Sequence, residues 1–526
     1  MSKAQRGMAM TRWIAGMVAV VLLAVGFVPA AAAPSVTPKR GGTLNATFSS
    51  DPAHFDPHRG TTAQNFVPLV YNGLVRFKTG TDVRVDEYVI EPDLAEKWEI
   101  SKDGLVYTFR LRRGVRFHDR PPVNGRELTA DDVVWSLQRM LADDPENIKR
   151  DLFSVIKSAE AVERYTVRVT LSEPFAPLMD NLATVFASIL PRAEIDYKQA
   201  AIGTGPFMLD SFTRGTRYVY KRHPNYYERG KPYVDEIVLL ILRDFATRAA
   251  ALRAGRIDVV DLLPYGQALP IIKEGNLAWE RYQGIFSVHL RLNVAKPPLD
   301  NEKARQALSL ALNRQAIAIA LGGGEGIVNG PVPTGLGKWA MDWRKLPFFT
   351  RDVAKARQIL REAGFPNGFT IDAVGGSSPD NRRVILEAIK AQWAQIGVTL
   401  NFRLVDTATV QRVRFQKDFV ILADNFTLSS DPDSYLFLEY HSKSSGNVGS
   451  YADQQVDRLL EAQRREIDPA KRQALVHQTQ ALIAQKAWII TTGDPIYVSL
   501  AWPYVKGFRH NNINQYLPLK NVWLDK

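Results

Sequence analysis

Strand signals and helix signals alternate irregularly along this chain, and this irregularity limits the possible folds more than any single motif does. Residues 97–118 predict two strands joined at residues 102–104, where Asp-Gly supplies the positive φ that a tight hairpin turn needs. The next segment, 128–141, predicts a helix, because Thr129 can cap it and Asp132 follows three residues later. Such a mixture argues against a barrel and against a helical solenoid.

Further segments of the chain also predict both strands and helices. A short strand is predicted at 43–48, and a helix that stops near Gly255 is predicted to lead into another strand. Two more helices are predicted from cap residues followed by apolar residues at helical spacing. These are Asp300 with Ala304, Leu308, Ala311 and Leu312, and Asp380 with Ile385, Ile389 and Trp393.

The N-terminal segment has the layout of a secretory signal peptide. Three cations precede an uncharged stretch that is shorter than the ~20 residues a membrane-spanning helix needs, and small residues follow at once. We expect cleavage near Ala32 or Ala33, and therefore export to the periplasm. The chain has no cysteine, so we expect neither disulfides nor a lipid on an N-terminal cysteine.

The charge balance is basic but dispersed. The net charge is +12, or about +9 once the cations of the signal segment are removed. Cations never run longer than pairs such as Arg112-Arg113, and acidic residues lie among them throughout. A nucleic-acid-binding surface would need a concentrated basic face. We therefore expect no nucleic-acid partner.

Motifs for catalysis or cofactor binding are hard to find. The glycine-rich segment 321–326 lacks the spacing of a dinucleotide loop and the Lys-Ser/Thr of a P-loop, so we interpret it as a turn. The segment 54–58, His-Phe-Asp-Pro-His, is more simply explained as a loop than as a metal site. The Asp-Pro-Asp-Ser-Tyr segment 431–435 has too few alternating oxygen ligands for a calcium loop. We expect no catalytic residue, no metal site and no cofactor.

Several separated stretches together resemble the solute-binding proteins of peptide/nickel-type ABC importers, the extracellular solute-binding family 5. Each stretch alone is weak, but they follow the family's order over nearly the whole mature chain. They lie at 41–44, 71–77, 92–119, 128–140, 203–207, 225–237, 251–261, 297–314, 360–369 with 395–398, and 431–435.

This resemblance implies an α/β fold of the two-lobe periplasmic binding protein type (type II, cluster C-like), with an extra subdomain in the first lobe. It places lobe I at 34–286 and 500–526, the subdomain at about 80–200, and lobe II at 287–499. The crossing segments are then expected near 284–293 and 498–505. Two lobes that close on a solute are a known switching mode.

The segment 424–435 resembles a wall of the family's ligand cleft. In relatives that bind peptides, the resemblance places a carboxylate three residues before the Asp-Pro, where it pairs with the peptide's α-ammonium. This chain has Leu428 at that position, and Asp424 is four residues too early. The departure argues against an ordinary peptide ligand. We expect Asn425 and Phe426 to face the ligand and Asp431 to hold the loop.

Two arginines suggest an anion site. Arg382 and Arg383 fall in the first turn of the helix predicted after Asp380, where the positive end of the helix disfavours cations by about 0.3–1 kcal/mol each. Two guanidiniums together with free backbone N–H groups can bind an anion. In similar dipeptide binders an arginine near position 383 meets the ligand carboxylate. Solvated surface remains the alternative for either residue.

Aromatic residues near the expected cleft could stack on a ligand, although an aromatic is more often a core residue. The candidates are Phe55, Tyr71, Phe286, Phe426 and Tyr435.

These observations favour a non-enzymatic solute-binding protein that delivers a peptide-like or other small organic solute, with an anionic group, to an inner-membrane ABC permease. We expect a monomer. Two alternatives remain open from the sequence. One is a periplasmic hydrolase of peptides or glycans, and the other is a periplasmic chaperone or sensor partner.

Overall fold

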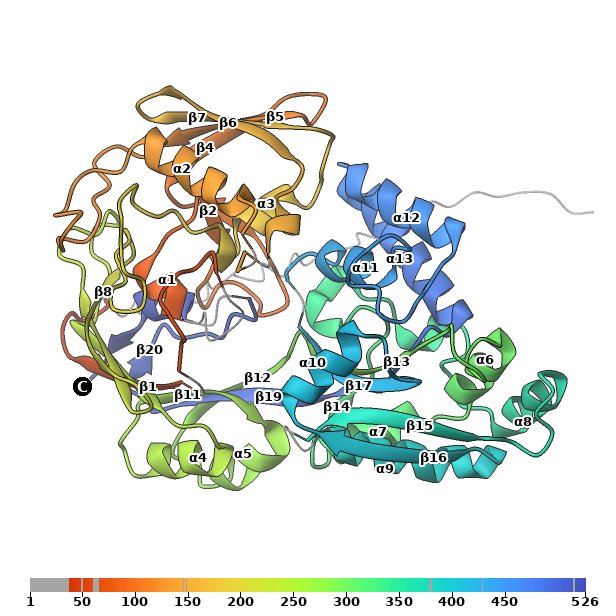
Figure 1. Ribbon diagram of the computed structural model, residues 1–526. Coiled ribbons are helices and arrows are strands. Elements are labelled where there is room, and N and C mark those ends of the chain that lie inside the picture. The colour runs from red at the N-terminus through yellow and green to blue at the C-terminus, as the bar shows by residue number, and fades with distance from the viewer. Residues whose placement is uncertain are drawn as a thin grey trace, which may run out of the picture. The chain divides into compact units, whose positions relative to one another are not determined.

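The computed structural model describes residues 37–48, 51–59, 66–144, 146–147, 149–377, 381–427, 429–513 and 516–526, without the side chains at positions 286, 381, 407 and 425–427. The predicted signal segment and the predicted cap Asp380 lie outside this range. Figure 1 shows the arrangement of the strands and helices. Among the described residues, no helix combines the length and the apolar character that crossing a membrane requires.

The strands of the described chain form four sheets and two isolated pairs. The first sheet has the order β1 (Thr43–Phe48), β10 (Glu236–Ile241), β9 (Arg217–Arg222), β8 (Phe207–Thr213). The second, antiparallel throughout, has the order β4 (Ala95–Ile100), β5 (Val106–Leu111), β7 (Thr166–Leu171), β6 (Ile156–Glu163). The third has the order β11 (Val259–Pro264), β19 (Asp494–Ala501), β12 (Ala278–Gln283), and β14 (Gly326–Ile327) also pairs with β19. The fourth has the order β16 (Thr399–Val405), β15 (Thr370–Gly376), β17 (Ile421–Thr427), β13 (Phe286–Leu292), β18 (Ile489–Thr491). The pairs are β2 (Val75–Phe77) with β3 (Ile90–Pro92), and β20 (Val505–Lys506) with β21 (Trp523–Leu524).

The helices cover these sheets. In chain order the α-helices are α1 (Val67–Val70), α2 (Ala130–Leu141), α3 (Leu178–Leu182), α4 (Phe245–Arg253), α5 (Tyr265–Ile272), α6 (Glu302–Leu310), α7 (Arg314–Leu321), α8 (Val353–Glu362), α9 (Asn381–Trp393), α10 (Thr407–Phe415), α11 (Asp433–Tyr440), α12 (Gln454–Arg465) and α13 (Pro469–Lys486). Helix α2 lies beside the β4–β7 sheet, and α4 and α5 lie along β11 and β19 (Figure 1).

Several predicted elements are confirmed. The strand at 43–48 is β1, and the predicted hairpin is β4 with β5, with Gly104 at φ +71° in its turn. Helix α2 begins after Thr129, whose backbone N–H donates to the Asp132 carboxylate at 3.0 Å. In α9, Ile385, Ile389 and Trp393 are all fully buried, as the helical spacing predicted.

The predicted cap of α6 was wrong by one residue. The cap is Asn301, whose side-chain oxygen accepts from the backbone N–H of Ala304 at 3.3 Å, and not Asp300. The helix also ends at Leu310, so Ala311 and Leu312 are buried beyond its end rather than along its face. Asp and Asn both cap well, and the sequence alone does not separate two adjacent candidates.

The third and fourth sheets are joined by two short connections. Strand β12 of the third sheet leads into β13 of the fourth through residues 284–285. The chain returns from β18 to β19 through residues 492–493, earlier than the 498–505 expected from the resemblance. Val498 and Leu500 already pack with α4 and α5 in the core beneath the third sheet.

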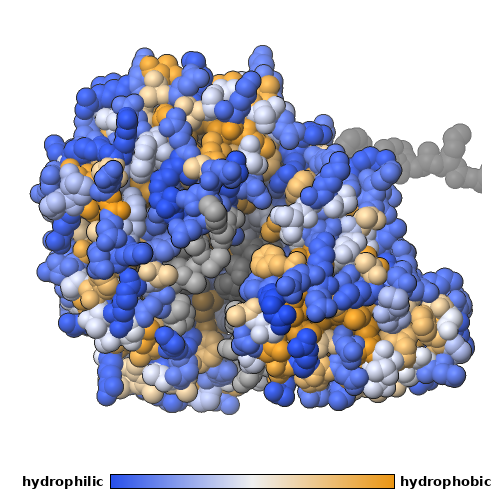
Figure 2. Space-filling view, viewed as in Figure 1, coloured by the Kyte–Doolittle hydropathy of each residue, from blue (hydrophilic) through white to orange (hydrophobic). Residues whose placement is uncertain are grey.

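Apolar residues gather in separate cores, one of which includes the fourth sheet and helices α6 to α9. On the face shown in Figure 2 the surface is mainly hydrophilic, with hydrophobic patches between. Strands β13 and β17 lie in the interior of the fourth sheet, and the described residues 287–292 and 421–424 are all buried. A charged side chain on these strands therefore has to find a partner nearby, because an unpaired buried charge is costly.

Candidate functional site

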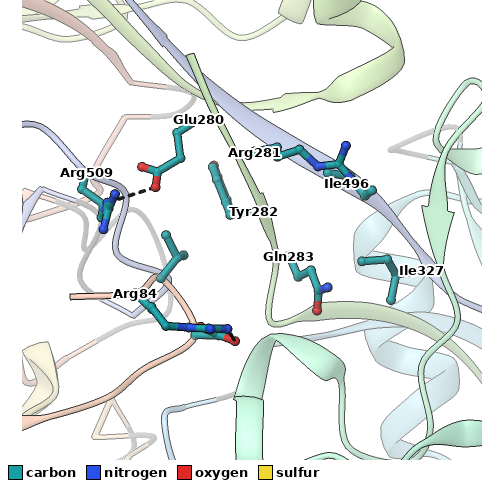
Figure 3. Close-up of a pocket in the computed structure, with 10 residues that line it drawn as sticks. Arg84, Glu280, Arg281, Tyr282, Gln283, Ile327, Ile496 and Arg509 are labelled. Atoms are coloured by element: carbon teal, nitrogen blue, oxygen red, sulfur yellow. Dashed lines mark hydrogen bonds and ion pairs between the residues drawn. The ribbon is translucent and has the colours of Figure 1, made fainter. Parts of the chain in front are cut away.

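One candidate site is a pocket of about 330 Å³, which we call the hinge pocket because strands β12 and β19 on its wall adjoin the two connections. Figure 3 shows Glu280, Tyr282 and Gln283 of β12 beside Arg509 and Arg84. Its lining residues are Arg84, Val85, Asp86, Glu280, Arg281, Tyr282, Gln283, Ile327, Ile496 and Arg509.

The charges that line the hinge pocket are paired with one another or with a neighbour. Arg84 pairs with Asp86 at 2.8 Å, Arg509 with Glu280 at 3.0 Å, and Arg281 with Glu325 at 3.3 Å. These pairs contain equal numbers of guanidiniums and carboxylates. Their side chains are also partly solvated, Arg84 to 77%. The hinge pocket therefore has no surplus charge that would select a charged ligand.

A second candidate site surrounds Asp424, in the middle of β17. Three guanidinium groups approach its carboxylate, from Arg414 at 3.1 Å, Arg291 at 3.6 Å and Arg382 at 3.7 Å. Glu439 of α11 accepts from Arg291 at 2.7 and 3.0 Å and from Arg414 at 3.1 Å. These five residues, which we call the Asp424 cluster, bring strands β13 and β17 and helices α9, α10 and α11 together.

The Asp424 cluster carries more positive than negative charge. It holds three guanidiniums and two carboxylates. The side chain of Arg291 is 0% exposed, whereas Asp424 keeps 9% and Arg414 keeps 18% of its surface in contact with solvent. The cluster is thus a mostly buried positive site with one partly open side.

The pKa values in this region follow from burial and from these neighbours. Burial works against the charge of Arg291, but Glu439 and Asp424 outweigh it and hold its pKa above the ordinary value. Burial lowers the pKa of Arg382, and Asp424 opposes that effect only in part. The pKa of His289 is lowered to about 3 by burial and by the charge of Arg291, so this imidazole is neutral at pH 7 and adds no positive charge.

Asp431 lies seven residues further on and belongs to a different group of charges. Both oxygens of its carboxylate accept from Arg472 of α13, each at 2.6 Å, and Oδ1 also accepts from the backbone N–H of Asp433 at 2.8 Å. Arg464 contacts Asp433 at 2.9 and 3.0 Å. Asp431 therefore holds the loop that leads into α11, as the turn interpretation of this segment predicted.

The two arginines predicted to bind an anion are separated by the structure. Arg382 is buried, with its guanidinium directed toward Asp424 and beside Gly376. Arg383 is exposed on the outer side of α9. The structure thus brings one of the two into the Asp424 cluster and leaves the other in solvent.

The described aromatic candidates are core residues. Phe55 is fully buried and packs edge-on against Phe66, Phe212 and Tyr218. The buried Tyr71 donates its hydroxyl to the carbonyl of Phe55 at 2.9 Å. Tyr435 is buried too, with its hydroxyl 2.9 Å from Nδ1 of His289. All three rings are buried in this structure, and their expected contact with a solute stays a prediction.

Other candidates fall where the structure gives no side chain. The side chains of Phe286, Asn425 and Phe426 are not described, and Leu428 lies outside the described residues. Their expected contact with a ligand stays a prediction. Among the described residues, no group of three or more metal-ligating side chains is found, and His58 of the His-Phe-Asp-Pro-His segment contacts the carbonyl of Ser188 at 2.8 Å.

Arg291, Arg414 and Glu439 of the Asp424 cluster were not among the residues predicted from the sequence. A signal was available for Arg291, which stands in the run Val-His-Leu-Arg-Leu at 288–292, because a charge inside an apolar run on a buried strand requires a partner. No local pattern marks Arg414 or Glu439 as partners of Arg291, because they lie on separate helices more than 100 residues further along the chain.

Comparisons with known proteins agree on one family. Residues 89–447 match the model of the bacterial extracellular solute-binding proteins, family 5 Middle. Heme-binding protein A of Haemophilus influenzae is 33% identical to this chain, over 85% of this chain and 86% of that protein. The periplasmic binding protein DppA of Helicobacter pylori, solved with the peptide STSA, superposes with a TM-score of 0.78 at 27% identity, covering 93% and 99% of the two chains. AgaA of A. tumefaciens R10, solved with agropinic acid, gives 0.77 at 27% identity, covering 92% and 99%.

Proposed function

Because the chain belongs to the bacterial extracellular solute-binding proteins of family 5, we propose that it captures its solute through an anionic group, which the arginines of the Asp424 cluster bind. As a member of this family, the chain has the two-lobe α/β fold and is the solute-binding component of an ABC importer. The proposal concerns the chemistry of the solute and the residues that select it.

The observation that carries this proposal is the charge balance of the Asp424 cluster. Among the described residues of the cluster, three guanidiniums face two carboxylates, and a mostly buried site rich in guanidiniums favours an anionic ligand. Asp424 is surrounded by arginines, and a carboxylate in that setting is a poor partner for a ligand ammonium. Arg382 and Arg414 are the arginines proposed to meet the solute, since their side chains keep 8% and 18% of their surface in contact with solvent whereas Arg291 keeps 0%.

The ligands named for the relatives support an anion as the shared feature. Haem, a peptide and agropinic acid all carry carboxylate groups, whereas haem has no α-amine. Leu428 replaces the carboxylate that the resemblance places opposite a peptide's α-ammonium. The solute proposed for this chain therefore has a carboxylate or a similar anionic group, and a free α-amine is not required.

We also propose the location, the oligomeric state and the mode of action that were expected from the sequence. The mature chain acts in the periplasm as a monomer after removal of residues 1 to 32 or 33, binds without converting its ligand, and delivers it to an inner-membrane permease. The lobes are proposed to meet at the two connections, 284–285 and 492–493. Phe286, Asn425 and Phe426 remain proposed ligand contacts, whereas Phe55, Tyr71, Arg383 and Asp431 are not carried into the proposed site.

The test begins with native mass spectrometry of protein purified without dialysis, which identifies a retained solute and also reports from the intact mass whether the leader is removed. Calorimetry then compares wild type with Arg382→Ala and with Arg383→Ala, a matched arginine one residue along the same helix. Loss of a buried charge partner typically costs 2–5 kcal/mol of binding free energy, and loss of a solvated arginine costs almost nothing. We expect Arg382→Ala to lose about 2–5 kcal/mol of binding free energy and Arg383→Ala to lose almost none.

Two further measurements decide the sign of the ligand's charge. An amidated or esterified analogue should bind as weakly to wild type as the native solute binds to Arg382→Ala. Leu428→Asp should weaken the native solute. Equal binding of the neutral analogue, or tighter binding by Leu428→Asp, would overturn the anion site. Turnover of the solute by pure protein would favour a hydrolase, and saturable binding of unfolded proteins alone would favour a chaperone.

A further inference from the structure

Helix α12 ends at a contact with a distant part of the chain. The last turn of a helix leaves backbone carbonyl groups without a partner inside that helix. The carbonyl of Arg464, in the last turn of α12, accepts from the backbone N–H of Ala176 at 2.7 Å. Ala176 lies between β7 and α3. A segment from another part of the chain therefore supplies a hydrogen bond that α12 cannot make by itself.

The side chain of Arg464 takes part in the same contact. Its guanidinium lies 3.4 Å from the centre of the Phe437 ring of α11 and 5.2 Å from the centre of the Phe175 ring. Its Nε also donates to both oxygens of Asp433, at 2.9 and 3.0 Å. Arg464 is thus anchored to α11 by Asp433 and Phe437, and it meets a second aromatic ring that arrives with Ala176.

Two further contacts lie around Arg464. Glu173 pairs with Arg465 at 2.8 Å, and these side chains are 45% and 55% exposed. In the turn of the β4–β5 hairpin, a Cβ atom placed on Gly104 would lie 3.8 Å from Cγ2 of Ile467, the residue between α12 and α13 whose side chain is among the exposed apolar ones. The contact therefore has its enclosed part at Arg464 and a solvated rim.

The two sides of this contact fall on different sides of the connections between the sheets. Residues 173–176 come before the first connection, 284–285, whereas α11 and α12 lie between that connection and the second one, 492–493. With the lobes proposed above, the contact therefore joins lobe I to lobe II through residues that belong to neither connection. We call it the closing interface.

We propose that the closing interface is a latch that holds the two lobes together, and that the contact between Arg464 and Phe175 is its centre. The latch rests on the lobe boundaries of the proposed function, and it goes beyond solute capture because all of its contacts are made between groups of the protein. Arg464 is anchored to Asp433, which belongs to the segment 424–435. The latch therefore contacts the same segment that contributes Asp424 to the proposed solute site.

The two rings beside Arg464 allow a matched pair of substitutions. A contact changes the ratio of open to closed protein only if it differs between the two forms. Phe437 and Arg464 belong to the same lobe, so their contact is present in both forms and cancels. Phe175 lies across the interface, so its contact with Arg464 is present only in the closed form. Phe175→Leu should therefore raise the ratio of open to closed protein about fivefold, as the loss of one ordinary cation–π contact would, and Phe437→Leu should leave it unchanged.

The test measures hydrogen exchange of the Ala176 amide in the full chain, dialysed free of solute. Pro174 and Pro177 have no N–H, so a fragment that covers 174–177 reports only on Phe175 and Ala176. We expect the Ala176 amide to exchange more slowly than an unprotected amide in wild type, about fivefold faster in Phe175→Leu after correction for intrinsic rates, and at the wild-type rate in Phe437→Leu. Unprotected exchange in wild type, or equal rates in wild type and Phe175→Leu, would overturn the latch.

A cross-link distinguishes lobe opening from local movement beside Ala176. Because the turn at Gly104 meets Ile467, Lys102→Cys and Ile467→Cys place two exposed thiols within reach of a short bismaleimide, and the chain has no other cysteine. The cross-linked lobes cannot separate, so Phe175→Leu should no longer accelerate exchange of the Ala176 amide. Acceleration that persists after cross-linking would overturn the latch. If Phe175→Leu fails to fold, Phe175→Met removes the same ring with a side chain that fills irregular core space.

Discussion

Asp424 and Asp431 lie seven residues apart in the chain, and the charged groups around them balance differently. Among the described residues, three guanidiniums approach the buried carboxylate of Asp424, and Glu439 adds one further carboxylate. Asp431 and Asp433 instead pair with Arg472 and Arg464, and we call these four residues the Asp431 cluster. The same residue type, aspartate, therefore sits among more guanidiniums than carboxylates at one site and in equal pairs at the other.

This difference teaches that the partners of a buried carboxylate decide its role. A positive surplus leaves room for an anion, and we assign the solute's anionic group to it. Where the charges pair one to one, as in the Asp431 cluster, the pairs hold the loop that leads into α11. The hinge pocket is a third case, because its charges also balance, but in partly solvated pairs.

The largest expected effect comes from breaking the ion pair at the centre of the Asp431 cluster. Arg472→Met leaves Asp431 buried without its cation, and we expect a loss of about 3–5 kcal/mol in the free energy of unfolding, measured by urea denaturation. The matched control is Arg465→Met, which breaks a pair whose side chains are 55% and 45% exposed and should cost less than about 1 kcal/mol. Similar losses for the two variants would show that burial does not make the Arg472 pair more costly to break than the Arg465 pair.

A smaller effect should distinguish the Asp424 cluster from the hinge pocket through the same chemical change. Asp424→Asn removes a buried negative charge and weakens charge-assisted hydrogen bonds, so we expect a loss of about 1.5–3 kcal/mol in the free energy of unfolding at pH 8. Asp86→Asn makes the same change in a pair that is 77% and 35% exposed, and it should cost less than about 1 kcal/mol. The comparison fails if the two substitutions destabilise the protein equally.

The smallest effect is expected at the hinge pocket. Arg84→Ala removes one member of a pair that is 77% and 35% exposed, and it should change the free energy of unfolding by less than about 1 kcal/mol. Calorimetry with the identified solute should also give wild-type affinity. If instead the affinity falls as far as it does in Arg382→Ala, the anion is bound in the hinge pocket and not at the Asp424 cluster.

Local elements could be predicted from the sequence with few errors. The hairpin at Gly104, the Thr129 cap and the buried face of α9 all depend on residues within one turn of each other, and the structure has them as expected. The cap of α6 was misplaced by one residue because two adjacent residues can both cap. The aromatic candidates Phe55 and Tyr71 were assigned by position near the expected cleft, but Phe55 packs against Phe212 and Tyr218, which lie far along the chain.

The sequence by itself determined the family, the mixed α/β elements and the absence of disulfides, because motif order, short-range periodicity and composition are local properties. Only the tertiary structure decided that Arg382 joins Asp424 while Arg383 does not, and that Asp431 is held by Arg472 from a distant helix. Charges interact through distance in space and through the burial that weakens the competition from water. Neither quantity can be read from separation along the chain.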